Sequence, residues 1–306
     1  MRINFLQQTI LIAAAISVVS SSVLADTPKG SIVWTGGYVS GIGVGSAKPT
    51  GNKAIDKANA VRAAELSAQR SLLETIKGVK INSTTTVENM AFVEEKINSS
   101  VEGIVRGAVT YSSKVEWEGG FPNARVEMRI CLSGEMNGCK GTGLASALNV
   151  DQLAPPPYAP TETLSMNEPL PGGVQQPAPK RGKTTATYDA SRKVTGLVLN
   201  LEGQTFEREM LPIVAVKTGD RLATVYCVKN VMPSVVRSYG TVRYADTLNQ
   251  AAKIADLGDN LLIMSVAEVT KENMVVITPE NAKILQQTMM NGNDYLSSAK
   301  VAISNR

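Results

Sequence analysis

Small apolar residues recur at helical spacing between Ala54 and Gly78, in the run AIDKANAVRAAELSAQRSLLETIKG. On a helical wheel centred on Val61, a smooth face forms from residues within about 60° of that position or at its margin. These residues are Ala54, Ala58, Ala64, Ala68, Leu72 and Ile76. Asn52 suits the N-cap and Gly78 the C-terminal stop. The pattern therefore predicts one long helix that packs closely against a sheet.

Glu65 is the one charged residue inside this apolar arc, at about 40° from Val61 on the wheel. A catalytic carboxylate would need a partner group, and the segment offers none. We therefore expect Glu65 to reach the rim of the contact between helix and sheet. Only a hydrolase hypothesis would assign chemistry to Glu65 or to Glu74.

Strand and helix patterns alternate around this helix in the first half of the chain. A glycine-interrupted strand (31–44) precedes it, and a strand (79–87), a helix (91–103) and two alternating strands (108–119 and 124–132) follow. Gly119, Gly120, Pro122 and Asn123 supply the turn between the last two strands. The order β-α-β-α-β-β predicts an open α+β sheet covered on one face by helices.

The second half also mixes strands with short helices. Strands are expected at 193–201, 211–216, 221–231, 260–269 and 274–278, and a helix at 245–257 that ends at Gly258. Another helix begins with Thr278 as cap and Pro279 at its first position. This half is expected to be a second, smaller α+β domain.

Proline separates the two halves, with eight prolines between Pro155 and Pro179. Because proline removes a hydrogen-bond donor and favours extended backbone, this segment is expected to be a linker with no core of its own. The expected organisation is 1–25, a signal peptide; 26–149, an α+β domain; 150–187, the Pro-rich linker; and 188–306, the C-terminal α+β domain.

The amino terminus has the three parts of a secretory signal peptide. Arg2 gives a basic start, Ile10 to Val19 an apolar core, and Val23-Leu24-Ala25 a small-residue cleavage site. We expect cleavage after Ala25, a periplasmic mature protein, and no spanning helix in it. A lipid anchor is not expected, because the first cysteine is Cys131.

Charge and composition narrow the class of partner. The formal net charge is +4, only four Phe and two Trp are present, and the basic residues are scattered apart from KRGK at 180–183. This argues against a nucleic-acid surface. The KRGK cluster fits a solvated linker tail, with docking to an acidic surface as the alternative.

Cysteine usage fits an oxidising compartment. Cys131 and Cys139 bound the short run CLSGEMNGC, whose glycines allow the chain to turn back, and a disulfide between them is predicted. Such a ring would contribute about 2.5 kcal/mol. Cys227 is left over, and we expect it at a buried strand position. With three cysteines and no histidine, no zinc site or other metal site is expected.

Candidate chemistry is otherwise sparse. The absence of histidine removes the usual base of serine and cysteine nucleophiles, so an enzyme is not expected. Gly41, Gly43 and Gly45 resemble a nucleotide loop, but Ser46 stands where the dinucleotide fingerprint needs glycine. A bulge, a bend or close approach of the long helix explains these glycines better.

Four scattered aspartates were also considered as cation ligands. They are Asp220, Asp246, Asp256 and Asp259. Their spacing fits no calcium loop, and helix-cap and turn roles are expected for them. No cofactor is therefore expected.

The long helix and its surroundings resemble a known family. Residues Arg62, Ala68, Leu72, Leu73, Glu74, Ile76 and Gly78, then VKINSTTTV and IVRGAVTYSSKVEWEGGFPNARVEMRICL, are similar to the LPP20 lipoprotein-like domain, also seen in flagellar assembly protein T. The resemblance covers about 31–133. The second half is similar to the domain that often follows, although Leu199 to Gly203 and Glu209 to Leu211 depart from its acidic strand and its turn.

The resemblance implies an exported envelope protein, associated with the flagellar basal body in some members, with no enzymatic site to transfer. Three hypotheses follow. The first is a periplasmic structural or assembly protein of the envelope that binds other envelope proteins through sheet edges and the linker. A homo-oligomer is one form that such a protein can take. The second is a module that binds a peptide, glycan or other small ligand in a cleft. The third is a hydrolase without histidine.

Overall fold

The structure is a computed structural model that describes residues 30–93, 95–134, 143–165, 186–290 and 293–306. It combines helices with several sheets, which confirms the α+β class. The predicted signal peptide and its cleavage site, the basic cluster 180–183 and Cys139 lie outside the described residues. The predictions made for them stay predictions.

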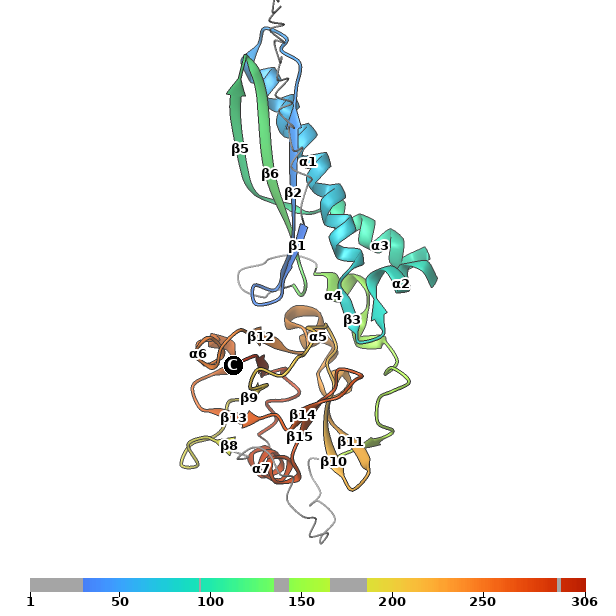
Figure 1. The fold of residues 1–306 in the computed structure, drawn as a ribbon, viewed down its shortest axis with the longest axis vertical. Helices are drawn as coiled ribbons and strands as arrows, with labels where there is room; N and C mark the ends of the chain where they lie inside the picture. Colours follow the sequence, from blue (N-terminus) through green and yellow to red (C-terminus); the bar gives the residue numbers. More distant parts are fainter. Residues whose placement is uncertain (1–29, 94, 135–142, 166–185, 291–292) are drawn as a thin grey trace, which may run out of the picture.

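The first half forms an elongated arm built on a four-stranded antiparallel sheet with the order β1-β2-β6-β5 (Figure 1). Its strands are β1 (Gly30–Val33), β2 (Tyr38–Ser46), β5 (Val109–Glu118) and β6 (Phe121–Cys131). Its helices are α1 (Lys53–Lys77), α2 (Val87–Val93), α3 (Glu95–Arg106) and α4 (Leu144–Ala147). A separate hairpin of β3 (Lys80–Asn82) and β4 (Thr85–Thr86) follows α1.

Helix α1 lies along one face of this sheet, against β2 and β6. Strand β2 presents Gly41, Gly43 and Gly45 to it. A Cβ on Gly43 would lie 2.1 Å from the Ala64 carbonyl oxygen and 2.2 Å from the Ala68 amide nitrogen. Glycine therefore allows the helix backbone to approach the strand backbone, as predicted from the sequence. No space for a phosphate remains between them.

The buried face of α1 is rotated from the predicted one by about half a residue. The fully buried positions include Ala60, Ala64, Ala68, Leu72 and Ile76. By contrast, Ala54 and Ala58 are exposed and Val61 is only half-buried. The glycines of β2 decide the contact, because a helix backbone can sit closest where the facing strand has no side chain. The N-cap prediction is confirmed: the Asn52 side chain accepts hydrogen bonds from two amides.

Three elements expected in the first half are divided in the structure. The strand 31–44 is two strands, β1 and β2, joined by a turn in which Gly37 has a φ of 68°. The strand 79–87 is the β3–β4 hairpin outside the main sheet, because Asn82 accepts from the Thr84 amide (3.1 Å) and closes a turn. The helix 91–103 is the pair α2 and α3.

The second half holds two five-stranded sheets. The first has the order β12-β16-β9-β13-β8, with β12, β16, β9 and β13 parallel. Its strands are β8 (Ala186–Thr187), β9 (Gly196–Asn200), β12 (Arg243–Ala245), β13 (Leu261–Ser265) and β16 (Val301–Ser304). The second has the order β14-β15-β10-β11-β7. Its strands are β7 (Glu162–Thr163), β10 (Val214–Thr218), β11 (Arg221–Tyr226), β14 (Glu268–Val269) and β15 (Val275–Ile277).

Short helices connect these strands, and two of the expected elements change. The helices are η2 (Val150–Gln152), η3 (Val228–Asn230), α5 (Pro233–Tyr239), α6 (Leu248–Ala251), η4 (Ala255–Leu257) and α7 (Pro279–Met289). The helix expected at 245–257 is instead the end of β12, then α6 and η4. The strand through Cys227 stops at Tyr226, and Cys227 is the half-buried N-cap of η3 with a free thiol. The cap by Thr278 on α7 is confirmed.

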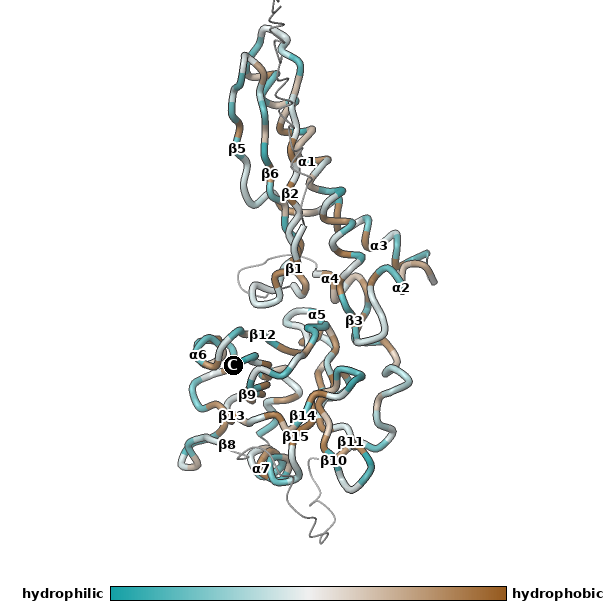
Figure 2. Tube along the Cα trace, viewed as in Figure 1, coloured by the Kyte–Doolittle hydropathy of each residue, from teal (hydrophilic) through white to brown (hydrophobic). Residues whose placement is uncertain are grey.

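One hydrophobic core runs through residues of both halves, from Val39 to Ile303. The division into two domains therefore stays a prediction. The described parts of 150–187 are built into the fold, which differs from a simple linker: Val150 is buried, β7 pairs with β11, and β8 pairs with β13. The Cα trace carries hydrophobic colour at positions along α1 and along the central strands of the second half (Figure 2). Across the described ranges, no helix is long and apolar enough to cross a bilayer.

Candidate binding groove

Backbone hydrogen bonds join the two halves on both sides of their junction. The Met210 amide donates to the Lys80 carbonyl and the Leu211 amide to the Ile81 carbonyl, each at 2.9 Å. On the other side, the Gly134 amide donates to the Arg237 carbonyl at 3.1 Å. Because β3 and the end of β6 are both held in this way, the segment before Leu211 has a defined position against the arm.

An ion pair between Arg237 and Asp151 supports the same junction. The Arg237 Nη1 donates to Asp151 Oδ2 at 2.6 Å, and the Asp151 side chain is only 5% exposed. Its other oxygen has no hydrogen-bond partner in the described parts of the chain. The pair therefore compensates a buried carboxylate that stands at the start of the Pro-rich segment.

Replacing Arg237 by methionine should destabilise the protein by about 2 kcal/mol, because the Asp151 carboxylate would stay buried without its cation. Chemical denaturation at neutral pH measures this change. The double variant Asp151→Asn with Arg237→Met should recover a large part of the loss, since no charge is left unpaired. Equal stability of the Arg237→Met variant and the wild type would contradict this role.

Aromatic side chains from both halves meet beside this junction. Trp34, in the β1–β2 turn, contacts Tyr244 of β12 edge to face, with ring centroids 5.6 Å apart. Phe206 lies on the same tyrosine at 6.2 Å. The buried Tyr244 hydroxyl donates to the Glu209 carbonyl (2.7 Å) and accepts from the Glu209 amide (3.2 Å). Burial raises the pKa of Tyr244, so its hydroxyl stays protonated. The two hydrogen bonds to Glu209 hold the ring in one place.

A groove of about 460 Å³ opens beside these aromatic rings. It lies at the carboxyl ends of the parallel strands β9, β12 and β16, where open α/β sheets commonly bind ligands. Its volume is in the usual range for sites of small ligands. The lining residues that matter here are Trp34, Gln204, Thr205, Phe206, Arg208 and Asn305.

Arg208 supplies a positive charge in this groove. Its guanidinium pairs with Asp246 and lies 5.7 Å from the centre of the Tyr244 ring, and its side chain is 27% exposed. Gln204, in contrast, has both ends engaged, since it donates to the Val266 carbonyl and accepts from the Val269 amide. The groove thus offers aromatic surface and one guanidinium, which already pairs with Asp246 and is partly exposed.

The segment between Gly203 and Glu209 has no regular secondary structure and leaves backbone groups free. The amides of Thr205 and Phe206 donate to no other residue that the structure describes. Thr205 is exposed and Phe206 half-buried. An extended backbone with free donors along a groove can bind another extended chain.

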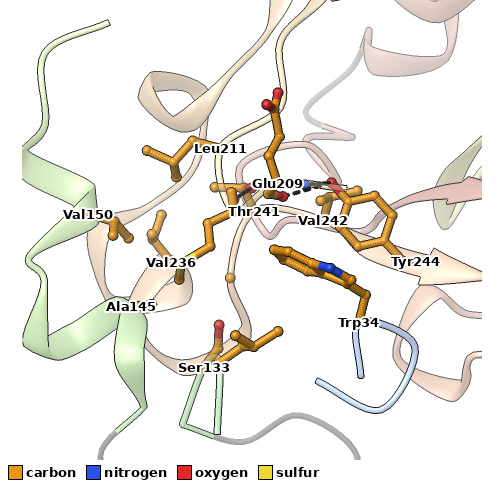
Figure 3. A pocket seen from close by; sticks show the side chains of 13 residues that line it. Trp34, Ser133, Ala145, Val150, Glu209, Leu211, Val236, Thr241, Val242 and Tyr244 are labelled. Atoms are coloured by element: carbon orange, nitrogen blue, oxygen red, sulfur yellow. Dashed lines mark hydrogen bonds between the residues drawn. The ribbon is translucent and has the colours of Figure 1, made fainter. Parts of the chain in front are cut away.

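A second cavity, of only about 30 Å³, lies deeper in the junction (Figure 3). Ser133, Ala145 and Val150 line it from the first part of the chain, and Val236 and Thr241 from the second. Its volume is close to that of one water molecule. It is therefore a packing gap at the junction and is too small for an organic ligand.

The Glu209 carboxyl points away from Trp34 and Tyr244 in Figure 3. The residue is 2% exposed, and one carboxyl oxygen bonds to no described residue. Burial raises the pKa of this carboxyl to about 8, although a hydrogen bond from Asn273 and the charge of Lys80 oppose the shift. Glu209 therefore carries a proton at neutral pH in most molecules. The carboxyl lies on the side of the segment 203–209 away from Trp34 and Tyr244, and Glu209 does not line the groove.

Three residues singled out from the sequence, Glu65, Glu74 and Cys131, do not line this groove. Glu65 is partly exposed on α1 and pairs with Arg62 at 3.4 Å, which fits the expected rim position, and Glu74 is exposed on the same helix. Cys131 is buried at the end of β6. Its disulfide with Cys139 stays a prediction because Cys139 lies outside the described residues.

The four aspartates only partly follow the prediction of cap and turn roles. Asp220 lies in the β10–β11 turn, as expected. The others form ion pairs: Asp246 with Arg208, Asp256 with Arg243 and Asp259 with Arg192. Tertiary contacts bring these arginines to them from distant segments, and spacing along the chain does not reveal such pairs.

Sequence reasoning assigned no binding role to the residues that line the groove. Trp34 was expected within a strand, and Phe206 and Arg208 stand in a segment with no periodic pattern. The available signals were the two short runs 199–203 and 209–211, which border the segment of Phe206 and Arg208. Among the described residues, no three histidine, cysteine, aspartate or glutamate side chains gather as a metal site would require.

A scan against protein-family models and a search of curated proteins found no match for this chain.

Proposed function

We propose that this protein is an exported structural or assembly protein of the bacterial cell envelope that acts by contacts with other proteins. In this proposal the groove beside Trp34 and Tyr244 holds an extended peptide segment of an envelope partner. The observation that carries it is the groove itself, at the carboxyl ends of β9, β12 and β16. A role in flagellar assembly is the specific form that the LPP20-like resemblance suggests.

Three features of the groove support an extended peptide. The free amides of Thr205 and Phe206 can pair with the backbone of a bound chain. The rings of Trp34 and Phe206 can contact apolar side chains, and Arg208 can pair with a carboxylate. Binding requires no chemical step, and the proposal assigns no catalytic residue. It also assumes the periplasmic location that the signal peptide predicts.

A glycan is the second candidate ligand, because the same aromatic rings could stack on a sugar. Trp34 and Phe206 line the groove together with Arg208, which could bind an acidic sugar or a peptide carboxylate. The two candidates differ in what remains attached to the protein after cross-linking.

A photo-cross-linking amino acid at Thr205 tests both candidates in cells that express the full chain. We expect an adduct with an envelope protein, which mass spectrometry identifies. The same group at Lys217, an exposed position on β10 outside the groove, serves as the control. Arg208→Ser and Phe206→Ser should each remove the adduct while circular dichroism stays unchanged. An adduct with glycan alone would favour the second candidate, and no adduct specific to Thr205 would overturn both.

A further inference from the structure

Strand β5 stands at the open edge of the arm's sheet, away from the groove (Figure 1). It is ten residues long, and nine of these are exposed, with only Val115 half-buried. It pairs with β6 on one side, and none of the described strands pairs with its other side. A long open edge of this kind can pair with another strand, which most soluble proteins prevent.

The part of β5 from Ser112 to Glu118 is regular. A register shift lies before it, at Thr110–Ser112, and from there each residue faces one residue of β6 up to Glu118 opposite Phe121. Val115 faces the buried Ala124 and so lies on the α1 side, whereas Lys114 faces the exposed Arg125 and lies on the outer side. Lys114 and Glu116 therefore project from the same outer face.

This stretch is complementary to itself when two copies run antiparallel. With a two-fold axis at Val115, Lys114 lies directly opposite Glu116 of the partner subunit, and this pair occurs twice. Ser113 then lies opposite Trp117 of the partner subunit on the α1 side. Each Trp117, which is 41% exposed in one chain, would gain cover from the other. Opposite charges directly across two strands stabilise their pairing.

Other registers are less favourable for a physical reason. Facing residues in a sheet must project to the same side, so the axis can move only in steps of one residue along the strand. An axis at Lys114 places two lysines opposite each other, and an axis at Glu116 places two glutamates opposite each other. Like charges in this position destabilise the pair. Within the regular stretch the charges therefore favour an axis at Val115 over an axis at either neighbouring residue.

We propose that two copies of this protein pair edge to edge through antiparallel β5 strands, with the two-fold axis at Val115. The dimer would join the two four-stranded sheets into one, with an α1 helix of each copy on the same face. Within one chain Lys114 and Glu116 already form an ion pair, but their side chains are 76% and 68% exposed, so that pair adds little. The dimer does not rest on the groove, which stays open at the other end of the arm.

Exchange of the two charges tests this pairing with the full mature chain. Lys114→Glu and Glu116→Lys, each alone, place like charges opposite each other at two points, and each should weaken dimerisation at least about tenfold. The double variant K114E/E116K restores opposite charges and should return the wild-type dissociation constant. Analytical ultracentrifugation over a range of concentrations measures all four proteins. Both positions are exposed, so each variant should keep the fold of the single chain, which circular dichroism checks.

A cysteine at the axis provides an independent readout. Val115→Cys should form a disulfide-linked dimer under mild oxidation, because residues at a two-fold axis between strands lie within disulfide reach. Val44→Cys, at an exposed position of the arm two strands away from the edge, should not. The wild type controls for cross-links through Cys227. A wild type that stays monomeric at all concentrations, or a double variant as weak as the single ones, would overturn the proposal.

Discussion

Replacing Gly43 by alanine should destabilise the protein by about 3 kcal/mol or more, because the new methyl group has no space. Its carbon would lie 2.1 Å from the Ala64 carbonyl oxygen and 2.2 Å from the Ala68 amide nitrogen. Both neighbours are backbone atoms in the middle of α1, so no side chain can rotate away. The helix would have to move off β2 and lose close contact along its buried face.

Gly103→Ala is the matched control for this substitution. Gly103 lies on an exposed side of α3, and a Cβ there meets nothing within 4 Å. Alanine in a helix interior is favoured over glycine by about 1 kcal/mol, so this variant should be stabilised. Thermal unfolding followed by circular dichroism compares the two variants. A Gly43→Ala protein as stable as the wild type would contradict the close seating of α1 on β2.

The second large effect concerns Glu209 and pH. The pKa of its buried carboxyl is about 8 in the folded protein, against an ordinary value of 4.5. Between these two values the folded state holds a proton that the unfolded state has released. The contribution of Glu209 to the free energy of unfolding is therefore fully present below about pH 4.5. It is lost as pH rises toward 8, by up to about 1.4 kcal/mol per pH unit.

Glu209→Gln should remove this slope, because the amide has the shape of the protonated carboxyl and does not ionise. The variant should be more stable than the wild type at pH 8, by a few kcal/mol, and similar to it near pH 4.5. Chemical denaturation at a series of pH values measures both proteins. Glu74→Gln, on the exposed side of α1, should keep the wild-type slope. Parallel curves for wild type and Glu209→Gln would show that the carboxyl is not buried as described.

Local patterns predicted those elements in which one residue type dominates a repeating position. The long helix was predicted almost to the residue, with its Asn52 cap, because small residues recur over seven turns. The hairpin of β5 and β6 was predicted from two strand-like runs on either side of the turn residues Gly119 and Gly120. Close approach of the long helix was one of three explanations predicted for the glycines of β2. The structure confirms it, because a Cβ at Gly43 would collide with the backbone of α1.

Short elements were predicted less well because their boundaries depend on side-chain hydrogen bonds and on distant strands. The strand expected at 79–87 is turned back by the Asn82 side chain. Strand β16 was not predicted at all, and it exists because it inserts between β12 and β9 in the first sheet of the second half. The local sequence around Val301 does not indicate which strands will pair with it.

Sequence alone determined the α+β class, the long helix with its glycine-bearing strand, and the expectation that no histidine-based chemistry occurs. Those features depend on residue type and short-range periodicity, which are present in the linear chain. Tertiary structure alone decided the groove, because Trp34 and Tyr244 are far apart in sequence and meet only when the two halves dock. It also decided the protonation of Glu209, since desolvation depends on what surrounds a carboxyl after folding.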